Sequence, residues 1–176
     1  MIRARREVYR NRWVTLREKE VLFPWTSQVQ EFYSLQVPDY VCVVPEMDDG
    51  RIILVRQYRP AVEDSCWEFP SGTREPGETP EETAHKELRE ETGFSCRDLF
   101  PLGKFSTDVG RLENFLYGFG ARRLSPENFQ PEPGLELRLV SPGELEEMIE
   151  EGVFNFALHL AIWEAFRRRR CRPPQP

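Results

Sequence analysis

The sequence of 176 residues predicts a mixed α/β fold, in which helices cover both faces of a mixed β-sheet. Apolar runs typical of strands occur both before and after one strongly capped helix near the middle of the chain. Two further helical segments follow the last of these runs and close the chain. Strands on both sides of a helix, followed by closing helices, indicate a three-layer α/β/α sandwich. The length suits a single domain with a sizeable core.

Four segments before the central helix are predicted to be strands, namely residues 12–21, 29–37, 41–44 and 51–55. The first two carry loosely alternating and aromatic side chains, which favour extended structure. The other two are continuously apolar, so we expect their strands to be covered on both faces. Asp48-Asp49-Gly50 lies between these two and is a strong signal for a hairpin turn.

The central helix is predicted between residues 79 and 93 by signals at both of its ends. Thr79 suits the N-cap, Pro80 the first helical position, and Glu82 the third position of a capping box. Gly93 is placed to end the helix in a left-handed conformation. These signals are local, so they predict the helix independently of the rest of the fold.

This helix has an acidic face and an apolar face. Glu87, Glu90 and Glu91 stand at positions i, i+3 and i+4, so their carboxylates converge on one side. Ala84 and Leu88 lie on another side and can anchor the helix to a core. Like charges so close repel one another, whereas a hard divalent cation that takes oxygen ligands turns them into a binding site. The alternative is a solvated amphipathic helix, on which glutamate is common.

After the central helix the chain again alternates between strand, loop and helix signals. The predicted elements are a strand at 112–119, a loop at 125–134, a half-buried strand at 135–140, a helix from Ser141 to near Gly152, and a last helix from about Asn155 into Arg167–Arg170. The basic end of the last helix complements the helix dipole, a reading that we favour over a nucleic-acid patch.

The composition argues against several classes of function. A net charge of −6 disfavours nucleic-acid binding through phosphate neutralisation. No apolar run has the length of a membrane span, and the N-terminal residues lack the apolar centre of a signal peptide. The four cysteines form no CxxC pair, so we expect neither a zinc site nor a disulfide framework. We therefore expect a cytoplasmic protein that binds neither nucleic acid nor membrane.

The acidic helix and the glycine-containing loop before it resemble the Nudix box of the Nudix hydrolase superfamily. That box specifies glycine, glutamate, an Arg-Glu pair, an aliphatic residue, a Glu-Glu pair, glycine and an apolar residue at fixed spacing. The corresponding positions in this chain are Gly72, Glu78, Lys86, Glu87, Leu88, Glu90, Glu91, Gly93 and Phe94. Only Lys86 departs from the pattern, because it stands where the family has arginine. It keeps the positive charge but loses the planar donor that can hold a carboxylate with two hydrogen bonds.

The resemblance implies the Nudix fold and a metal-dependent enzyme that hydrolyses nucleoside diphosphates linked to a second group. It assigns the three helix glutamates (Glu87, Glu90 and Glu91), together with the backbone carbonyl of Ser71, to two or three Mg²⁺ ions, for which Mn²⁺ can substitute. Such ions bridge the protein to the diphosphate and offset the charge that builds on the phosphoryl oxygens.

The sequences that flank the box resemble the branch of ADP-ribose pyrophosphatases and nucleoside diphosphate sugar hydrolases. The relevant stretches are Val55–Pro60, Trp67–Gly72 and Gly77–Pro80. The branch implies hydrolysis of the pyrophosphate bond of ADP-ribose or a related sugar nucleotide, which gives two monophosphates. The alternatives are another substrate, such as GDP-mannose, UDP-glucose or NADH, and a non-catalytic Nudix module that binds such a ligand to regulate a partner.

The resemblance also implies five substrate contacts, at Arg56, Arg59, Glu68, Trp25 and Tyr33. The arginines suit phosphates, and the glutamate suits ribose hydroxyls or an amino group. The two aromatic side chains, with Phe32, can stack on a base. The structural alternatives are a solvated strand residue for Arg56 and packing in a core or interface for the aromatic side chains.

Members of this branch commonly exchange N-terminal strands, which implies a homodimer. We therefore expect residues 1–40 to form a strand extension for dimerisation and residues 41–170 to form the Nudix hydrolase domain. Residues 171–176 are expected to be a frayed tail.

The general base is open between several glutamates. Members of the branch often supply it from a mobile loop before the last helices, which makes Glu132 the first candidate. Glu136, in the following strand, and Glu113, in a loop that often faces the metal site, are two others. A glutamate of the box is the fourth candidate. His85 and His159 are expected to be structural residues.

Overall fold

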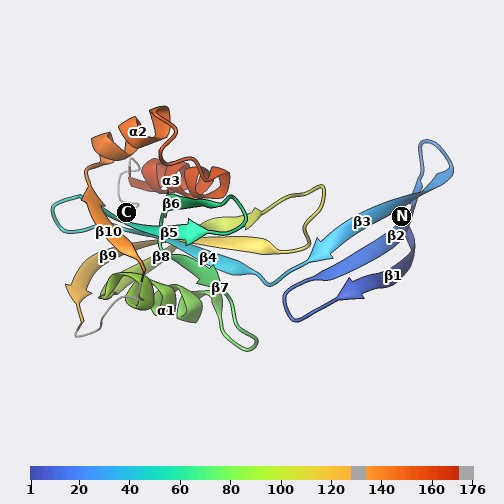
Figure 1. Ribbon diagram of the computed structural model, residues 1–176, viewed down its shortest axis with the longest axis horizontal. Helices are drawn as coiled ribbons and strands as arrows, with labels where there is room; N and C mark the ends of the chain where they lie inside the picture. The colour runs from blue at the N-terminus through green and yellow to red at the C-terminus, as the bar shows by residue number, and fades with distance from the viewer. Residues whose placement is uncertain (128–133, 171–176) are drawn as a thin grey trace, which may run out of the picture. The chain divides into compact units, whose positions relative to one another are not determined.

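A computed structural model describes residues 1–127 and 134–170. Within these ranges ten strands and three helices follow one another (Figure 1). The strands are β1 (Ile2–Arg10), β2 (Thr15–Phe23), β3 (Gln28–Gln36), β4 (Tyr40–Pro45), β5 (Ile52–Arg59), β6 (Asp64–Glu68), β7 (Ser71–Thr73), β8 (Phe94–Ser106), β9 (Phe115–Pro126) and β10 (Glu136–Val140). The helices are α1 (Pro80–Thr92), α2 (Pro142–Glu150) and α3 (Ala157–Arg170).

The chain forms two compact units. The N-terminal unit comprises residues 1–39 together with residues 105–116, which are distant from them in sequence. The box unit comprises the rest of the described chain. The boundaries given above for a strand extension and a Nudix domain remain predictions, and the predicted tail lies outside the described residues.

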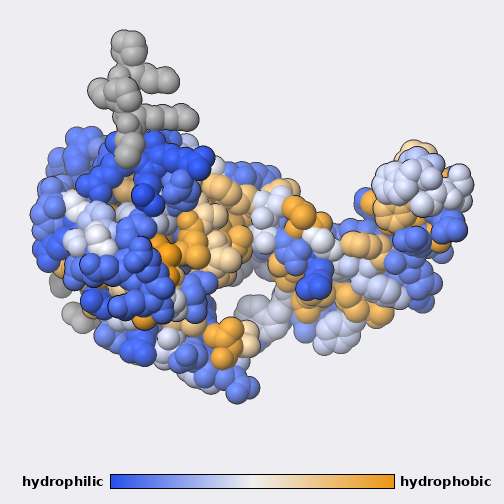
Figure 2. Space-filling model, turned by 90° about the horizontal axis from the view of Figure 1, so that it is seen from above, coloured by the Kyte–Doolittle hydropathy of each residue, from blue (hydrophilic) through white to orange (hydrophobic). Residues whose placement is uncertain are grey.

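The N-terminal unit is built on an antiparallel sheet with the strand order β1-β2-β3. Leu35 of β3 joins residues 105–116 to this sheet: its N–H donates to the carbonyl of Arg111 at 2.8 Å, and its carbonyl accepts from Glu113 N–H at 3.0 Å. Several apolar side chains of this sheet are exposed. They include Ile2, Val8, Val29 and Phe32. Figure 2 shows hydrophobic residues, in orange, at the surface of the molecule.

The box unit has three layers. Its strands form two sheets, with the orders β7-β4-β9-β8 and β10-β5-β6. Helix α1 packs against β4 and β7 on one side of the strands, whereas α2 and α3 lie on the opposite side (Figure 1). The predicted three-layer α/β/α fold is therefore confirmed.

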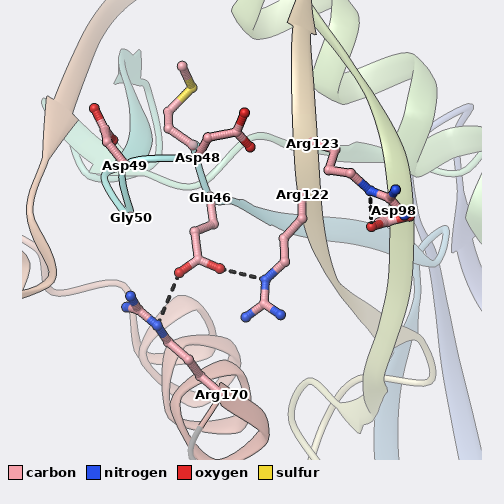
Figure 3. Close-up of a pocket in the computed structure, with 9 residues that line it drawn as sticks. Glu46, Asp48, Asp49, Gly50, Asp98, Arg122, Arg123 and Arg170 are labelled. Atoms are coloured by element: carbon pink, nitrogen blue, oxygen red, sulfur yellow. Dashed lines mark hydrogen bonds and ion pairs between the residues drawn. The ribbon is translucent and has the colours of Figure 1, made fainter. Parts of the chain in front are cut away.

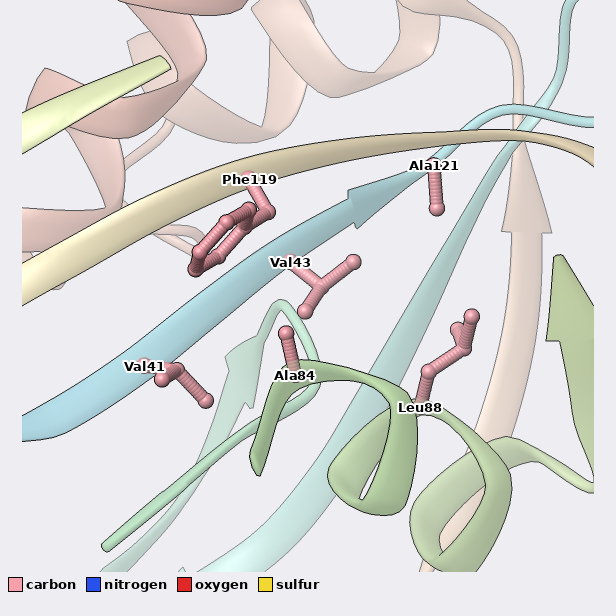
Figure 4. Close-up of a cluster of buried hydrophobic side chains, with 6 residues drawn as sticks. All are labelled: Val41, Val43, Ala84, Leu88, Phe119 and Ala121. Carbon is pink, nitrogen blue, oxygen red and sulfur yellow. The ribbon is translucent and has the colours of Figure 1, made fainter. Parts of the chain in front are cut away.

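A buried cluster between α1 and the four-stranded sheet positions the box helix. Its residues are Val41, Val43, Ala84, Leu88, Phe119 and Ala121 (Figure 4). Ala84 and Leu88 are four positions apart, so both point from one face of α1 towards the strands, as predicted. Burial of a leucine side chain is worth about 1.5–3 kcal/mol, so this contact fixes the rotation of α1 on the sheet.

A second cluster packs α3 against the connection between β6 and β7. Phe69, from that connection, lies with its ring centroid 5.0 Å from that of Phe154 and 6.2 Å from that of Trp163. His159 stacks on Phe69 at 5.9 Å. All four side chains are buried, so α3 and this connection form one rigid part of the unit.

Both predicted capping boxes are present. The Thr79 hydroxyl accepts from Glu82 N–H at 3.2 Å, and the Glu82 carboxylate accepts from Thr79 N–H at 2.8 Å. Ser141 and Glu144 make the equivalent pair at the start of α2. Gly93 has a φ of 74° and ends α1 in the left-handed conformation that was predicted.

Most predicted elements are found within one to four residues of their expected bounds. The strand expected at 112–119 starts only at Phe115 and continues to Pro126, and β1, β6, β7 and β8 have no counterpart among the strands given above. The strand expected at 135–140 is present as β10, but it is not half-buried, since Leu137 and Leu139 are 39% and 40% exposed. It lies at the edge of its sheet, with β5 as its neighbour, and only Val140 is buried. No helix within the described ranges is long and apolar enough to cross a membrane.

Candidate active site

Glu87, the first box glutamate of α1, lies directly against Gly72, the first residue of the box. A Cβ atom built on Gly72 would lie 2.1–2.3 Å from the carboxyl atoms of Glu87, far inside van der Waals contact. Only glycine therefore leaves room for this carboxylate against the backbone of β7. The close approach explains in physical terms why the pattern begins with glycine and continues with this glutamate.

The second ordered carboxylate belongs to Glu91, which is 5% exposed. One of its oxygens accepts from Ser71 N–H at 2.9 Å, and the other accepts from the Gln57 side-chain amide at 3.3 Å. Burial raises the pKa of Glu91 to about 8, against the hydrogen bond from Ser71 and with the help of the nearby Glu87 charge. At neutral pH this carboxyl group therefore retains its proton in the absence of a cation.

Glu90 completes the acidic face and is half-exposed. Among the described residues, no three Asp, Glu, His or Cys side chains are grouped so that they hold a metal ion as they stand. Like charges repel without a counter-ion. Glu87 and Glu91 lie against Gly72 and Ser71, two adjacent residues at the start of β7. The donor set nevertheless fits a hard divalent cation, because the three side chains share one turn of helix and offer only oxygen atoms.

Lys86, the one departure from the box pattern, pairs with Glu78, another box position. Its Nζ lies 3.8 Å from Glu78 Oε1, at the long end of the ion-pair range. The Glu78 carboxylate also accepts from the Thr83 hydroxyl at 2.9 Å and from Glu75 N–H at 3.2 Å. The lysine thus keeps a charge contact across the loop that precedes α1, but with a single donor.

Replacement of Lys86 by Arg is expected to leave turnover equal or higher by up to about fivefold, the range expected of a partly exposed ion pair. The reason is that a guanidinium can reach both oxygens of Glu78. Steady-state kinetics of this variant beside Lys86→Met, which removes the charge, make the comparison. A large loss in the arginine variant would show that lysine has a role of its own here.

Arg59 and Glu68, both predicted substrate contacts, bind each other. Arg59 Nε donates to Glu68 Oε1 at 2.7 Å, and its Nη2 donates to Oε2 at 2.6 Å, which is a two-pronged pair. The Glu68 side chain is 2% exposed, whereas that of Arg59 is 39% exposed. The buried carboxylate therefore orients the guanidinium, which keeps an exposed edge. Contact of either residue with substrate remains a prediction.

Arg56 and Glu136 lie opposite each other on β5 and β10. Their side chains approach to 3.4 Å, and the Arg56 guanidinium lies 5.9 Å from the centre of the Trp67 ring. Arg56, a predicted phosphate contact, thus forms an ion pair with Glu136, a candidate for the general base. Glu132, the first candidate for the base, lies outside the described residues.

The remaining predicted residues belong to the N-terminal unit. Glu113 binds Lys19, Arg17 and the hydroxyl of Ser34. Partial burial acts to raise its pKa, but the hydrogen bonds from Lys19 and Ser34 and the two positive charges lower that pKa to about 2. Such a carboxylate is a weak base. Trp25 is 78% exposed and its ring centroid is 5.0 Å from that of Phe23, while the hydroxyl of Tyr33 donates to Glu18 at 3.1 Å.

Figure 3 shows a pocket of about 490 Å³ that contains no box residue. At its centre Glu46 binds Arg122 at 2.6 Å and Arg170 at 3.1 Å, so it fastens the end of α3 to β4 and β9. Asp98 pairs with Arg123 at its edge. These ion pairs link separate elements of the fold, and we assign this pocket a structural role.

Two residues of the site were missed at the sequence level. Gln57 lies inside the stretch Val55–Pro60 that carried the family resemblance, and its amide binds Glu91. His159 was expected to be structural, and it accepts a hydrogen bond from the backbone beside Glu68. The first had a signal in the motif, whereas the second is 90 residues distant from its partner.

Residues 37–160 match the sequence pattern of the NUDIX domain. The ADP-ribose pyrophosphatase of Bacillus subtilis (strain 168) is 32% identical over 122 residues, which are 69% of this chain and 65% of that protein. The ADP compounds hydrolase NudE of Escherichia coli (strain K12) is 30% identical over 160 residues, which are 88% of this chain and 84% of that protein. The match to the B. subtilis protein thus spans slightly less than two thirds of its length.

A solved structure is similar along nearly the whole chain. The crystal structure of an ADP compounds hydrolase superposes with a TM-score of 0.84 and 27% identity, and the match covers 96% of this chain and 92% of that one. This similarity confirms the fold class predicted from the sequence.

Proposed function

Because this chain belongs to the NUDIX domain family, we propose that it hydrolyses the pyrophosphate bond of ADP-ribose or a related nucleoside diphosphate sugar with Mg²⁺. The products are two monophosphates. The relatives named above, an ADP-ribose pyrophosphatase and an ADP compounds hydrolase, support this substrate class. We further propose a cytoplasmic homodimer that binds no nucleic acid.

The observation that carries this proposal is that the carboxylates of two box residues, Glu87 and Glu91, lie against the first residues of β7. Glu87 lies on Gly72, and Glu91 accepts from the N–H of Ser71. Helix α1 and β7 are thereby held together. Glu90 and the Ser71 carbonyl would supply further oxygen donors to the cations. A merely solvated acidic helix would not bury Glu91 or require glycine beneath Glu87.

The proposed reaction needs residues that hold the cations and residues that orient those ligands. Glu87, Glu90, Glu91 and the carbonyl of Ser71 would hold the cations. When bound, Mg²⁺ supplies positive charge that offsets the charge developing on the phosphoryl oxygens. Gln57 and the Ser71 N–H orient Glu91, so its carboxylate needs little reorganisation once its proton is lost.

Substrate contacts are proposed for the exposed edge of Arg59, which Glu68 orients, and for Arg56. A guanidinium fixed by a buried carboxylate binds a phosphate oxygen without the entropy cost of ordering a free side chain. Trp25 and Tyr33 are proposed to stack on the base. Glu132, Glu136, Glu113 or a box glutamate would activate the water, and the low pKa of Glu113 makes it a weak base.

The proposed homodimer rests on the N-terminal sheet. Every residue of β1 is exposed, as are the apolar side chains of Val29 and Phe32 on β3. A three-stranded sheet with exposed apolar side chains gains stability when a second surface covers it. A second copy of this chain would cover it.

A panel of substrates tests the activity directly. With Mg²⁺ present, we expect release of monophosphate from ADP-ribose to exceed release from GDP-mannose, UDP-glucose and NADH. A non-catalytic binding module is the second candidate, because Lys86 makes only one long contact with Glu78. Measurable binding of ADP-ribose without turnover of any substrate would favour that module and contradict the enzyme.

A further inference from the structure

The connection between β6 and β7, residues 69 and 70, joins Glu68 to Ser71, two residues on which the site depends, and itself lies outside both strands. Strand β6 ends at Glu68 and β7 begins at Ser71. Residues 69, 70 and 71 each make a separate hydrogen bond through a backbone group. Pro70 O accepts from Val43 N–H at 2.9 Å, and Ser71 N–H donates to Glu91 at 2.9 Å. The third of these hydrogen bonds is made by the N–H of Phe69.

His159, on α3, accepts this hydrogen bond. Phe69 N–H donates to His159 Nδ1 at 3.1 Å, across 90 residues of sequence. Since a backbone N–H can only donate, Nδ1 must be the acceptor, and the ring hydrogen is on Nε2. Burial lowers the pKa of His159 to about 3, and the charge of Arg59 acts in the same direction, so the ring is neutral. The geometry therefore defines both the charge and the tautomer.

Within the described chain, histidine at this position satisfies one buried N–H group, that of Phe69, but leaves its own ring N–H unpaired. Among the described residues Nε2 has no hydrogen-bond partner, although it is buried. The ring lies among aromatic side chains, 4.3 Å from the ring of Phe156 and 5.9 Å from that of Phe69. An apolar residue would leave the Phe69 N–H without an acceptor, which is destabilising for a buried donor, whereas histidine accepts from it. What histidine adds is the acceptor at Nδ1.

We propose that His159 is a positioning residue, which fixes the connection 69–71 from α3 so that Glu68 and Ser71 face the cation and substrate site correctly. This inference rests on the function proposed above. Through Phe69 it acts on Glu68, which orients Arg59, and on Ser71, which orients Glu91. Helix α3 thereby takes part in the geometry of the site without touching the reacting atoms.

A matched pair of variants tests the proposal. In His159→Asn the side-chain amide can place its oxygen where Nδ1 lies, whereas in His159→Gln the amide reaches the position of Nε2 instead. We expect the asparagine variant to keep Mn²⁺ affinity and kcat within about threefold of the wild type. The glutamine variant should lose about tenfold in Mn²⁺ affinity and in kcat, with a smaller change in KM. His85→Gln, on the exposed side of α1, is the control and should match the wild type.

Three readouts separate the outcomes. Mn²⁺ binding is measured from the electron paramagnetic resonance signal of the free ion. Turnover is measured with ADP-ribose, and the exchange rate of the Phe69 amide is measured by NMR. Equal behaviour of the asparagine and glutamine variants overturns the positioning role while leaving the proposed function intact. Absence of both Mn²⁺ binding and turnover in the wild type contradicts the proposed function, and the positioning role with it. Should the glutamine variant not fold, rapid exchange of the Phe69 amide in the wild type overturns the proposal.

Discussion

Replacement of Glu91 by Gln should lower turnover of ADP-ribose by about a thousandfold, the upper end of the loss seen when one electrostatic contact to a transition state is removed. The variant keeps the shape of the side chain and an oxygen that can accept from Ser71 N–H. It loses the negative charge that a divalent cation needs. Steady-state kinetics at saturating Mg²⁺ measure the effect, and activity within tenfold of the wild type would contradict the role of Glu91 at the cation site.

The same variant should not be less stable than the wild type without metal. Glu91 titrates near 4.5 when unfolded and near 8 in the fold. Between these pH values the unfolded chain releases a proton that the folded chain retains, so this group destabilises the fold as pH rises from about 4.5 to about 8. Glutamine removes that pH-dependent cost. We therefore expect an equal or higher Tm at pH 7.5 by thermal denaturation, with no further increase when Mg²⁺ is added.

Glu81→Gln provides the matched control for this experiment. Glu81 lies in the first turn of the same helix and is exposed, away from the three glutamates of the acidic face. Glu81→Gln removes a negative charge from the same helix, so a general effect of helix charge on turnover would appear in this variant. Full activity of Glu81→Gln beside an inactive Glu91→Gln would assign the loss to the site.

Replacement of Gly72 by Ala should lower kcat by about a hundredfold while the protein remains folded. The added methyl group would lie 2.1–2.3 Å from the carboxyl atoms of Glu87. The carboxylate is the end of a flexible side chain, so it can move away at small cost to stability. Its displacement moves a proposed cation ligand, and the cation site loses its geometry.

Kinetics, Mn²⁺ affinity and Tm together test this prediction. Gly143→Ala is the control, because a Cβ there would meet no atom closer than 3.9 Å and the residue lies in the first turn of α2. That variant should equal the wild type in activity. A Gly72→Ala protein with normal kcat would show that Glu87 need not lie against the backbone of β7.

The box helix was predicted almost completely because its signals are local. Thr79, Pro80 and Gly93 define both ends of α1 through contacts within one turn, and Ala84 and Leu88 define its buried face. The core strands were found for a similar reason, since continuous apolar runs such as 41–44 have few alternatives to burial.

Other parts of the fold left no such signal. Every residue of β1 is exposed, so its sequence carries no alternation between a buried and an exposed face. Strand β7 has three residues and is defined by its pairing with β4 rather than by composition. β8 mixes apolar and polar side chains along 13 residues, most of them half-buried, and no regular period results.

In the candidate site, too, features with a local sequence pattern could be predicted and features that depend on tertiary contacts could not. The types and spacing of its carboxylates could be read from the sequence, but their surroundings could not. The pKa of Glu91 depends on burial and on Ser71, twenty residues away. The pairing of Arg59 with Glu68 depends on the register between β5 and β6. The hydrogen bond between Phe69 and His159 depends on where α3 crosses the sheets. Each is a tertiary contact without a local pattern.

The central claim is that Glu87, Glu90 and Glu91 hold divalent cations, which in turn bind a diphosphate. Anomalous diffraction from crystals grown with Mn²⁺ and a non-hydrolysable ADP-ribose analogue tests it most directly. We predict anomalous peaks within about 2.5 Å of oxygen atoms of these three side chains, between them and the diphosphate. A bound analogue with no peak at these carboxylates would contradict the account.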